Sequence, residues 1–186
     1  RYASDLSIKT LNHSLISFIV VDSTQGINFE DMRLINESLE NFCTPILVLN
    51  KWDLLNEEDK LNINSNLKTQ LKKFSWLNVI RISALTTKGL NKFSKTLNEV
   101  NSQLNNRIDT SDLNLYFREL WVAKPPHPFR GKRAKLKYVT QYDISPPSFS
   151  FNLSSRIPKN YYSFIENKLR EEFGFKNVSL KIKYKT

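Results

Sequence analysis

Two short polar segments carry residue types suited to reading a purine base. The first, Asn50-Lys51-Trp52-Asp53, comes directly after the apolar run Ile46-Leu47-Val48-Leu49. The ionised carboxylate of Asp53 only accepts hydrogen bonds, so it can take both the N1–H and the exocyclic amine of guanine, a donor pair that adenine lacks. Losing charged hydrogen bonds of this kind costs about 1.5 to 3 kcal/mol each. The segment therefore predicts an N-K-x-D guanine-recognition motif.

The second segment, Ser83-Ala84-Leu85, follows the strand-like run Val79-Ile80-Arg81-Ile82. Open α/β sheets bind ligands at the carboxyl ends of their strands, so both segments are expected at one edge of a sheet. The alternative is two solvated loops without a ligand. The candidate base-binding residues are Asn50, Lys51, Asp53, Ser83, Ala84 and Leu85.

The motifs that handle phosphates are not found in this sequence. No G-x-x-x-x-G-K-[ST] segment occurs, and the four glycines lie at 26, 89, 131 and 174. No D-x-x-G motif or switch threonine precedes the first strand-like run, so no residue is assigned a catalytic role. We expect this chain not to hydrolyse GTP alone, and Mg²⁺ to be held only through residues absent from it. No metal-binding cluster is predicted, because the single cysteine, Cys43, lies in an apolar stretch that predicts packing.

The elements that position the two segments form an alternating series. Buried-strand runs at 15–22, 45–50 and 78–82 are separated by stretches with helical spacing, which is typical of a parallel α/β sheet. Further helices are predicted over 61–74 and 89–106. A helix between the first two strand-like runs is expected to bury one stripe of side chains, formed by Met32, Ile35, Leu39 and Phe42.

After residue 108 the pattern changes, which predicts two domains, 1–108 and 109–186. The second should contain a helix to about residue 123, a proline-rich turn at 124–131 and two strands joined at Pro146-Pro147. Pro158 then introduces a helix that Gly174 terminates, and 180–185 forms the last strand. The second domain is therefore a small α+β domain of the order helix, strand, strand, helix, strand.

The strands of the second domain are predicted to have one apolar and one basic face. Ala134, Leu136 and Tyr138 are assigned to the apolar face. If the three strands share one sheet, six cations lie together on the opposite face: Arg133, Lys135, Lys137, Lys181, Lys183 and Lys185. This patch could meet RNA phosphates or an acidic flank of another domain, or it could be a solvated face.

The charge supports a nucleic-acid partner for the second domain. Residues 1–108 hold 13 Lys and Arg against 11 Asp and Glu, whereas residues 109–186 hold 15 against 7. A merely soluble basic domain is the alternative. No run approaches the roughly 20 apolar residues of a membrane span, and the first residues do not have the order of a signal peptide. We therefore expect a cytoplasmic protein without a membrane partner.

Taken together, the chain resembles the C-terminal part of the Der (EngA) GTPases, which carry two tandem GTPase (G) domains. Asn50 to Leu54 resembles their N-K-W-D-L, Ser83-Ala84-Leu85 their S-A-K or S-A-L loop, and Val20 to Gly26 their V-x-D-A-T-E-G strand end. Further similar segments are Arg1 to Leu11, which resembles the helix after the D-T-P-G segment; Pro128 to Gln141, which resembles G-R-R-x-K-I-x-Y-A-T-Q; and Glu166 to Phe175, which resembles E-N-Q-L-R-E-A-F-G-F.

The resemblance implies a partial P-loop-GTPase-type sheet followed by a KH-like domain. It implies GTP or GDP as ligand, with Asn50 bracing the neighbouring loops, the Lys51 stem covering the base, and the Ala84 N–H meeting guanine O6. It also implies a role in assembly of the large ribosomal subunit through ribosomal RNA, with the missing N-terminal G domain as a partner. The G-x-x-G loop by which KH domains clamp RNA is not present. The alternative is a non-enzymatic RNA-binding or ribosome-binding module in which the half G domain is a scaffold.

Overall fold

The computed structural model describes residues 14–186, which divide into two compact units. The first contains the described residues up to Asn101 and also Asn177–Ser179; the second contains Ser102–Lys176 and Leu180–Thr186. The domain boundary proposed after residue 108 stays a prediction. The segment Arg1 to Leu11, used for the resemblance, lies outside the described residues.

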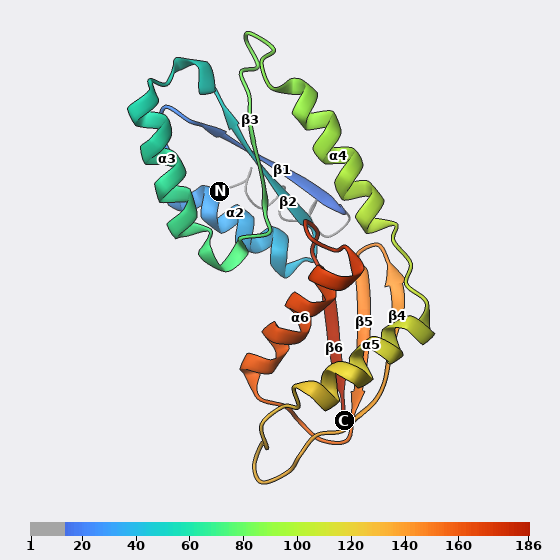
Figure 1. Ribbon diagram of the computed structural model, residues 1–186. Helices are drawn as coiled ribbons and strands as arrows, with labels where there is room; N and C mark the ends of the chain where they lie inside the picture. Colours follow the sequence, from blue (N-terminus) through green and yellow to red (C-terminus); the bar gives the residue numbers. More distant parts are fainter. Residues whose placement is uncertain (1–13) are drawn as a thin grey trace. The chain divides into compact units, whose positions relative to one another are not determined.

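The first unit is a parallel sheet with helices, as the sequence predicts (Figure 1). Its strands follow the order β1-β2-β3, and both pairings are parallel. The elements are β1 (Ile16–Asp22), α2 (Phe29–Glu40), β2 (Thr44–Asn50), the 3-10 turn η1 (Trp52–Leu54), α3 (Glu57–Gln70), the 3-10 turn η2 (Lys72–Phe74), β3 (Asn78–Arg81) and α4 (Leu90–Leu104).

Strand β2 is the central strand, and its side chains are buried on both faces. Leu47 and Leu49 are fully buried in a cluster with Ile19 and Val21 of β1 and with residues of α2 and α3. On the opposite face of β1, the ring of Phe18 stacks on Phe93 of α4 with centroids 4.6 Å apart. Burial on both faces explains why the sequence of β2 is a continuous apolar run.

A capping box fixes the start of α2. The Asn28 side chain accepts a hydrogen bond from the Asp31 N–H, and the Asp31 carboxylate accepts one from the Asn28 N–H. The other end differs from the prediction, because α2 ends at Glu40 and Phe42 lies in the following turn with a φ of 56°. Phe42 is therefore not part of the buried helical stripe that the sequence predicts.

The second unit has the predicted order helix, strand, strand, helix, strand. Its sheet order is β4-β5-β6, with β4 antiparallel and β6 parallel to β5. Both helices lie in front of the sheet in Figure 1, and Phe117 of α5 contacts Phe151 of β5 edge to face, with centroids 4.9 Å apart. The elements are α5 (Thr110–Ala123), β4 (Leu136–Ile144), β5 (Pro147–Leu153), α6 (Lys159–Phe173) and β6 (Lys181–Lys185).

The predicted faces of β4 are wrong after Leu136. That residue pairs with Leu153, but the next pairing joins Tyr138 to Asn152, so Lys137 is an extra residue in the strand. Such a bulge reverses the alternation that follows it. Val139 is therefore buried, whereas Tyr138, assigned to the apolar face, is 48% exposed.

The Glu166–Phe175 segment forms the end of α6. Arg170 is buried; its guanidinium bonds the Glu166 carboxylate at 2.7 Å and donates to the Phe175 carbonyl at 3.0 Å. Gly174 ends the helix in the left-handed region with a φ of 79°. The side chain of Arg170 thus ties the helix to the turn that follows it, which gives this segment a structural role.

We predict that Arg170→Met destabilises the chain. The exchange leaves the buried Phe175 carbonyl without its charged donor, and we expect the free energy of unfolding to fall by about 1 to 3 kcal/mol in urea denaturation. The control is Lys168→Met, which removes a surface ion pair with Glu171 and should change the stability far less, because solvent screens such a pair. Equal losses in the two variants would contradict the role given to Arg170.

Candidate guanine-recognition site

The first predicted segment turns back sharply at the end of β2. Asn50 is the last residue of the strand, and Lys51 adopts the left-handed conformation, with φ 59° and ψ 30°. This conformation is uncommon for a residue other than glycine. The turn is held to the neighbouring strand end, because the Trp52 N–H donates to the Ile82 carbonyl at 3.1 Å. Asp53 follows within the 3-10 turn, and its side chain is exposed.

The second predicted segment forms a closed loop after β3. Ser83 is buried; its N–H donates to the Lys88 carbonyl at 2.9 Å, and its Oγ accepts from the Thr86 N–H at 3.1 Å. Gly89 closes the loop with a φ of 83°, and a Cβ there would come within 2.3 Å of the Arg81 carbonyl oxygen. Only glycine fits at that position.

Asn50 joins the two segments. Its Oδ1 accepts a hydrogen bond from the Ala84 N–H at 3.0 Å, so the side chain braces the neighbouring loop. The same N–H is the donor expected to meet guanine O6. That contact stays a prediction, and it requires the donor to be shared between Asn50 and the base, an arrangement known as a three-centre hydrogen bond.

Lys51 forms an ion pair that the sequence analysis did not identify. Its Nζ lies 2.6 Å from Oδ2 of Asp22, the last residue of β1. The bond from Lys51, together with the bonds that Thr24 donates to Oδ1, lowers the pKa of Asp22 to about 2. The pairing of β1 with β2 places Asp22 directly opposite Asn50. Knowledge of this strand register would have identified Asp22 as a partner for Lys51.

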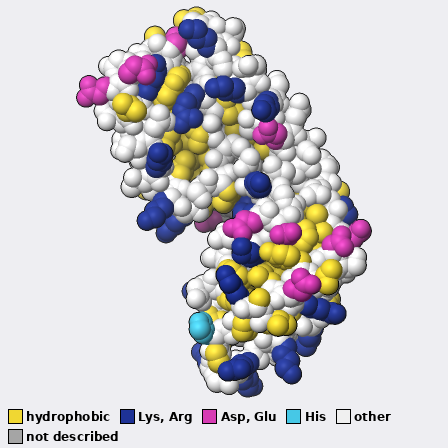
Figure 2. All heavy atoms as spheres, viewed as in Figure 1, with side chains coloured by type: hydrophobic (Ala, Val, Ile, Leu, Met, Phe, Trp, Pro, Cys, Tyr) yellow, Lys and Arg dark blue, Asp and Glu magenta, His cyan; other side chains and the backbone are white. Residues whose placement is uncertain are grey.

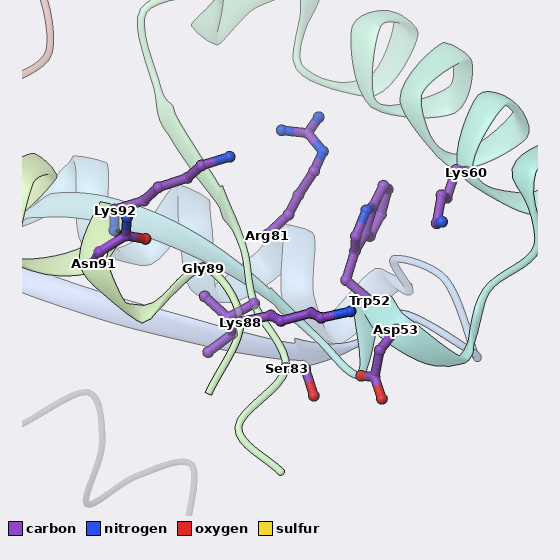
Figure 3. A pocket seen from close by; sticks show the side chains of 10 residues that line it. Trp52, Asp53, Lys60, Arg81, Ser83, Lys88, Gly89, Asn91 and Lys92 are labelled. Atoms are coloured by element: carbon purple, nitrogen blue, oxygen red, sulfur yellow. Dashed lines mark hydrogen bonds between the residues drawn. The ribbon is translucent and has the colours of Figure 1, made fainter. Parts of the chain in front are cut away.

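Asp53 lies beside a basic hollow of about 400 Å³ in the first unit (Figure 3). Among the lining residues, Asp53 alone is acidic. In Figure 3 the side chain of Lys88 extends toward Trp52 and Asp53. Four cations line the hollow and make it basic: Lys60, Arg81, Lys88 and Lys92. Leu85 lies in the adjoining loop, 89% exposed.

The second set of candidate residues lies on the sheet of the second unit. Lys181, Lys183 and Lys185 pair in register with Ser148, Ser150 and Asn152, so these three lysines share one face of the sheet. The other three candidates precede the regular part of β4 or lie at its bulge, and all are exposed: Arg133, Lys135 and Lys137. Three of the six predicted cations are therefore placed on one face by strand pairing.

Comparisons with known proteins find relatives over nearly the whole chain. Residues 107–185 match a family model described as the KH-domain-like of EngA bacterial GTPase enzymes, C-terminal. A protein named GTPase Der from Chlorobium luteolum is 32% identical over 187 residues, which cover 98% of this chain and 43% of that relative. GTPase Der from Alkaliphilus metalliredigens is 32% identical over 190 residues, which cover 100% of this chain and 43% of that relative.

The chain is related to the C-terminal part of the Der (EngA) GTPases. It spans 43% of the length of the Der proteins named above. Among solved structures, a crystal structure of a variant of Aquifex aeolicus Era bound to GDP.AlF4- has a TM-score of 0.45 and 15% identity, covering 97% of this chain and 68% of that one. No helix within residues 14–186 is long and apolar enough to cross a membrane.

Acid should weaken the link between Asp22 and Lys51 in this Der relative. The folded pKa of Asp22, about 2, lies below its ordinary value of 3.8, so its contribution to stability is complete only well above pH 3.8 and is lost as the pH falls through 2. We therefore expect the chain to be more stable than Asp22→Asn in urea above about pH 5, and most of the difference to be lost by pH 2. A difference that persists unchanged at pH 2 would show that the Asp22 charge is not its source.

Proposed function

We propose that this chain is the guanine-reading and RNA-contacting part of a cytoplasmic Der-type GTP-binding protein that acts in assembly of the large ribosomal subunit. The observation that supports base reading most directly is the bond from the Ala84 N–H to Asn50, which holds the two predicted segments together. The relatedness to GTPase Der proteins supports the guanine nucleotide as ligand.

In this proposal each segment has a separate task in reading the base. The exposed Asp53 carboxylate accepts from guanine N1–H and from the exocyclic amine, while the Ala84 N–H donates to O6. Lys51 is held by Asp22, and its carbon stem covers the base from one side. The cations around the hollow beside Asp53 attract the anionic nucleotide.

The phosphates and Mg²⁺ are proposed to be bound by residues of a Der-type protein that are absent from this chain. Among residues 14–186, β1 pairs with β2 alone, which leaves the outer edge of β1 available to a further strand. No step of GTP hydrolysis is assigned to residues of this chain. The nucleotide would therefore be GTP or GDP, with its base held here and its phosphates held elsewhere.

The second unit is proposed to contact ribosomal RNA with the face of its sheet that the helices leave open. The strands of this sheet carry four lysines but only one carboxylate, that of Asp143. On the helix side, which Figure 2 views, acidic and basic side chains lie together. The excess of lysines over carboxylates on the strands gives the open face the sign that RNA phosphates require.

Asp53→Asn should change which base the chain prefers. An amide donates where a carboxylate accepts, so the variant should lose guanosine and gain xanthosine, whose extra carbonyl oxygen can accept from it. We would compare guanosine, xanthosine and adenosine monophosphates by NMR titration. Asp59→Asn, at the start of α3 and outside the hollow, carries the same charge change and should keep the preference for guanosine. An unaltered preference in Asp53→Asn would remove Asp53 from the site.

Salt should weaken RNA binding by the second unit. If the lysines neutralise several phosphates, the affinity for RNA should fall by about a factor of ten to a thousand between low and physiological salt. A variant with Lys181, Lys183 and Lys185 all changed to Glu should bind RNA weakly at both salt concentrations. The control changes Arg118, Lys124 and Lys159 to Glu, three exposed cations outside the strands. A flat salt response, or equal losses in the two variants, would contradict contact through this face.

A further inference from the structure

The open face of the second sheet combines exposed aromatic rings with lysines. Tyr138 and Tyr142 of β4 are 48% and 43% exposed, although both are large and partly apolar. They line a shallow hollow of about 170 Å³ together with Thr140, Ser150, Asn152, Lys183 and Lys185. The hollow lies wholly within the second unit. Resting on the RNA contact proposed above, we infer that this face binds unpaired, single-stranded RNA by stacking bases on Tyr138 and Tyr142.

Strand pairing arranges the face in rows. Tyr138 pairs with Asn152, which pairs with Lys185, so one row runs from an aromatic ring across an amide to an ammonium group. The next row contains Thr140, Ser150 and Lys183. Each row therefore offers polar groups for a base edge and, on β6, a charge for the phosphate.

The two rings are placed to receive separate bases. Four residues of strand span at most about 13 Å, and Tyr142 is itself an extra residue where the register shifts. No ring contact joins Tyr138 to Tyr142 within residues 14–186. The ammonium of Lys183 lies over the face of the Tyr142 ring, 5.1 Å from its centre. A base that stacks on that face would replace the ammonium there and leave Lys183 free to meet a phosphate, as in proteins that bind single strands.

The middle strand contributes small side chains to the hollow. Ser150, which is buried, and Asn152 line it, while the large rings of Phe149 and Phe151 are buried on the helix side. The Ser150 Oγ is buried and finds no hydrogen-bond partner within residues 14–186. Buried hydroxyl groups are normally paired, so this atom lacks a partner that a ligand or water could supply.

Stacking on tyrosine selects single strands over duplexes. In an A-form duplex the faces of the bases are covered by their neighbours, and a protein contacts mainly phosphates and 2′-hydroxyl groups. A contact made by lysines alone would bind both forms. The exposed tyrosines are therefore the feature that distinguishes this inference from a general electrostatic contact.

The test measures binding of the complete 186-residue chain to a fluorescein-labelled, unstructured uridine-rich RNA and to a blunt RNA duplex of the same length. The double variant Y138A/Y142A should bind the single strand about tenfold or more weakly for each tyrosine lost. The matched control is Y138F/Y142F, which keeps both rings and should bind within about twofold of the native chain. Circular dichroism would establish that both variants are folded.

Three outcomes are separable. Preference for the single strand, lost with alanine and kept with phenylalanine, supports the inference. If the duplex binds equally well and the alanine variant is unchanged, while the lysine variant loses binding, the stacking inference is wrong but the proposed RNA contact stands. If neither RNA binds at low salt, both proposals fall.

Discussion

The position of β2 between β1 and β3 is the constraint on which the candidate site depends. Parallel pairing brings three strand ends to one edge of the sheet, with Asp22 next to Asn50 in the register. Side chains then complete the connection: Lys51 bonds Asp22, and Asn50 accepts from the Ala84 N–H. A ligand at this edge would meet loops already held in place, so little ordering would be required on binding.

The sequence predicted the order of the helices and strands, and the guanine-reading role of the two segments stays a prediction. The unbroken apolar run of β2 predicts a central strand because both its faces are buried. The link between Asp22 and Lys51 was not predicted, since it depends on which strands are neighbours and in what register. The bond between Asn50 and the loop was expected only through the resemblance to Der proteins, and the structure contains it.

The faces of β4 show a different limit of sequence analysis. Alternation assigns Tyr138 to the apolar face with Leu136, but one extra residue, Lys137, reverses the pattern. No residue type in this stretch marks the bulge, so only strand pairing reveals it. The consequence is functional, because the bulge turns Tyr138 onto the open face beside the lysines of β6.

The central claim is that the loops at the ends of β2 and β3 read a guanine base. The most direct measurement is titration of the ¹⁵N-labelled chain with GMP and with AMP, following the backbone amides of Ala84 and of Lys51 to Leu54. Base contacts alone provide on the order of 4 kcal/mol, so we expect weak binding, about millimolar, with shifts at these amides for GMP and not for AMP. Equal shifts with both nucleotides, or shifts confined to residues elsewhere, would contradict the account.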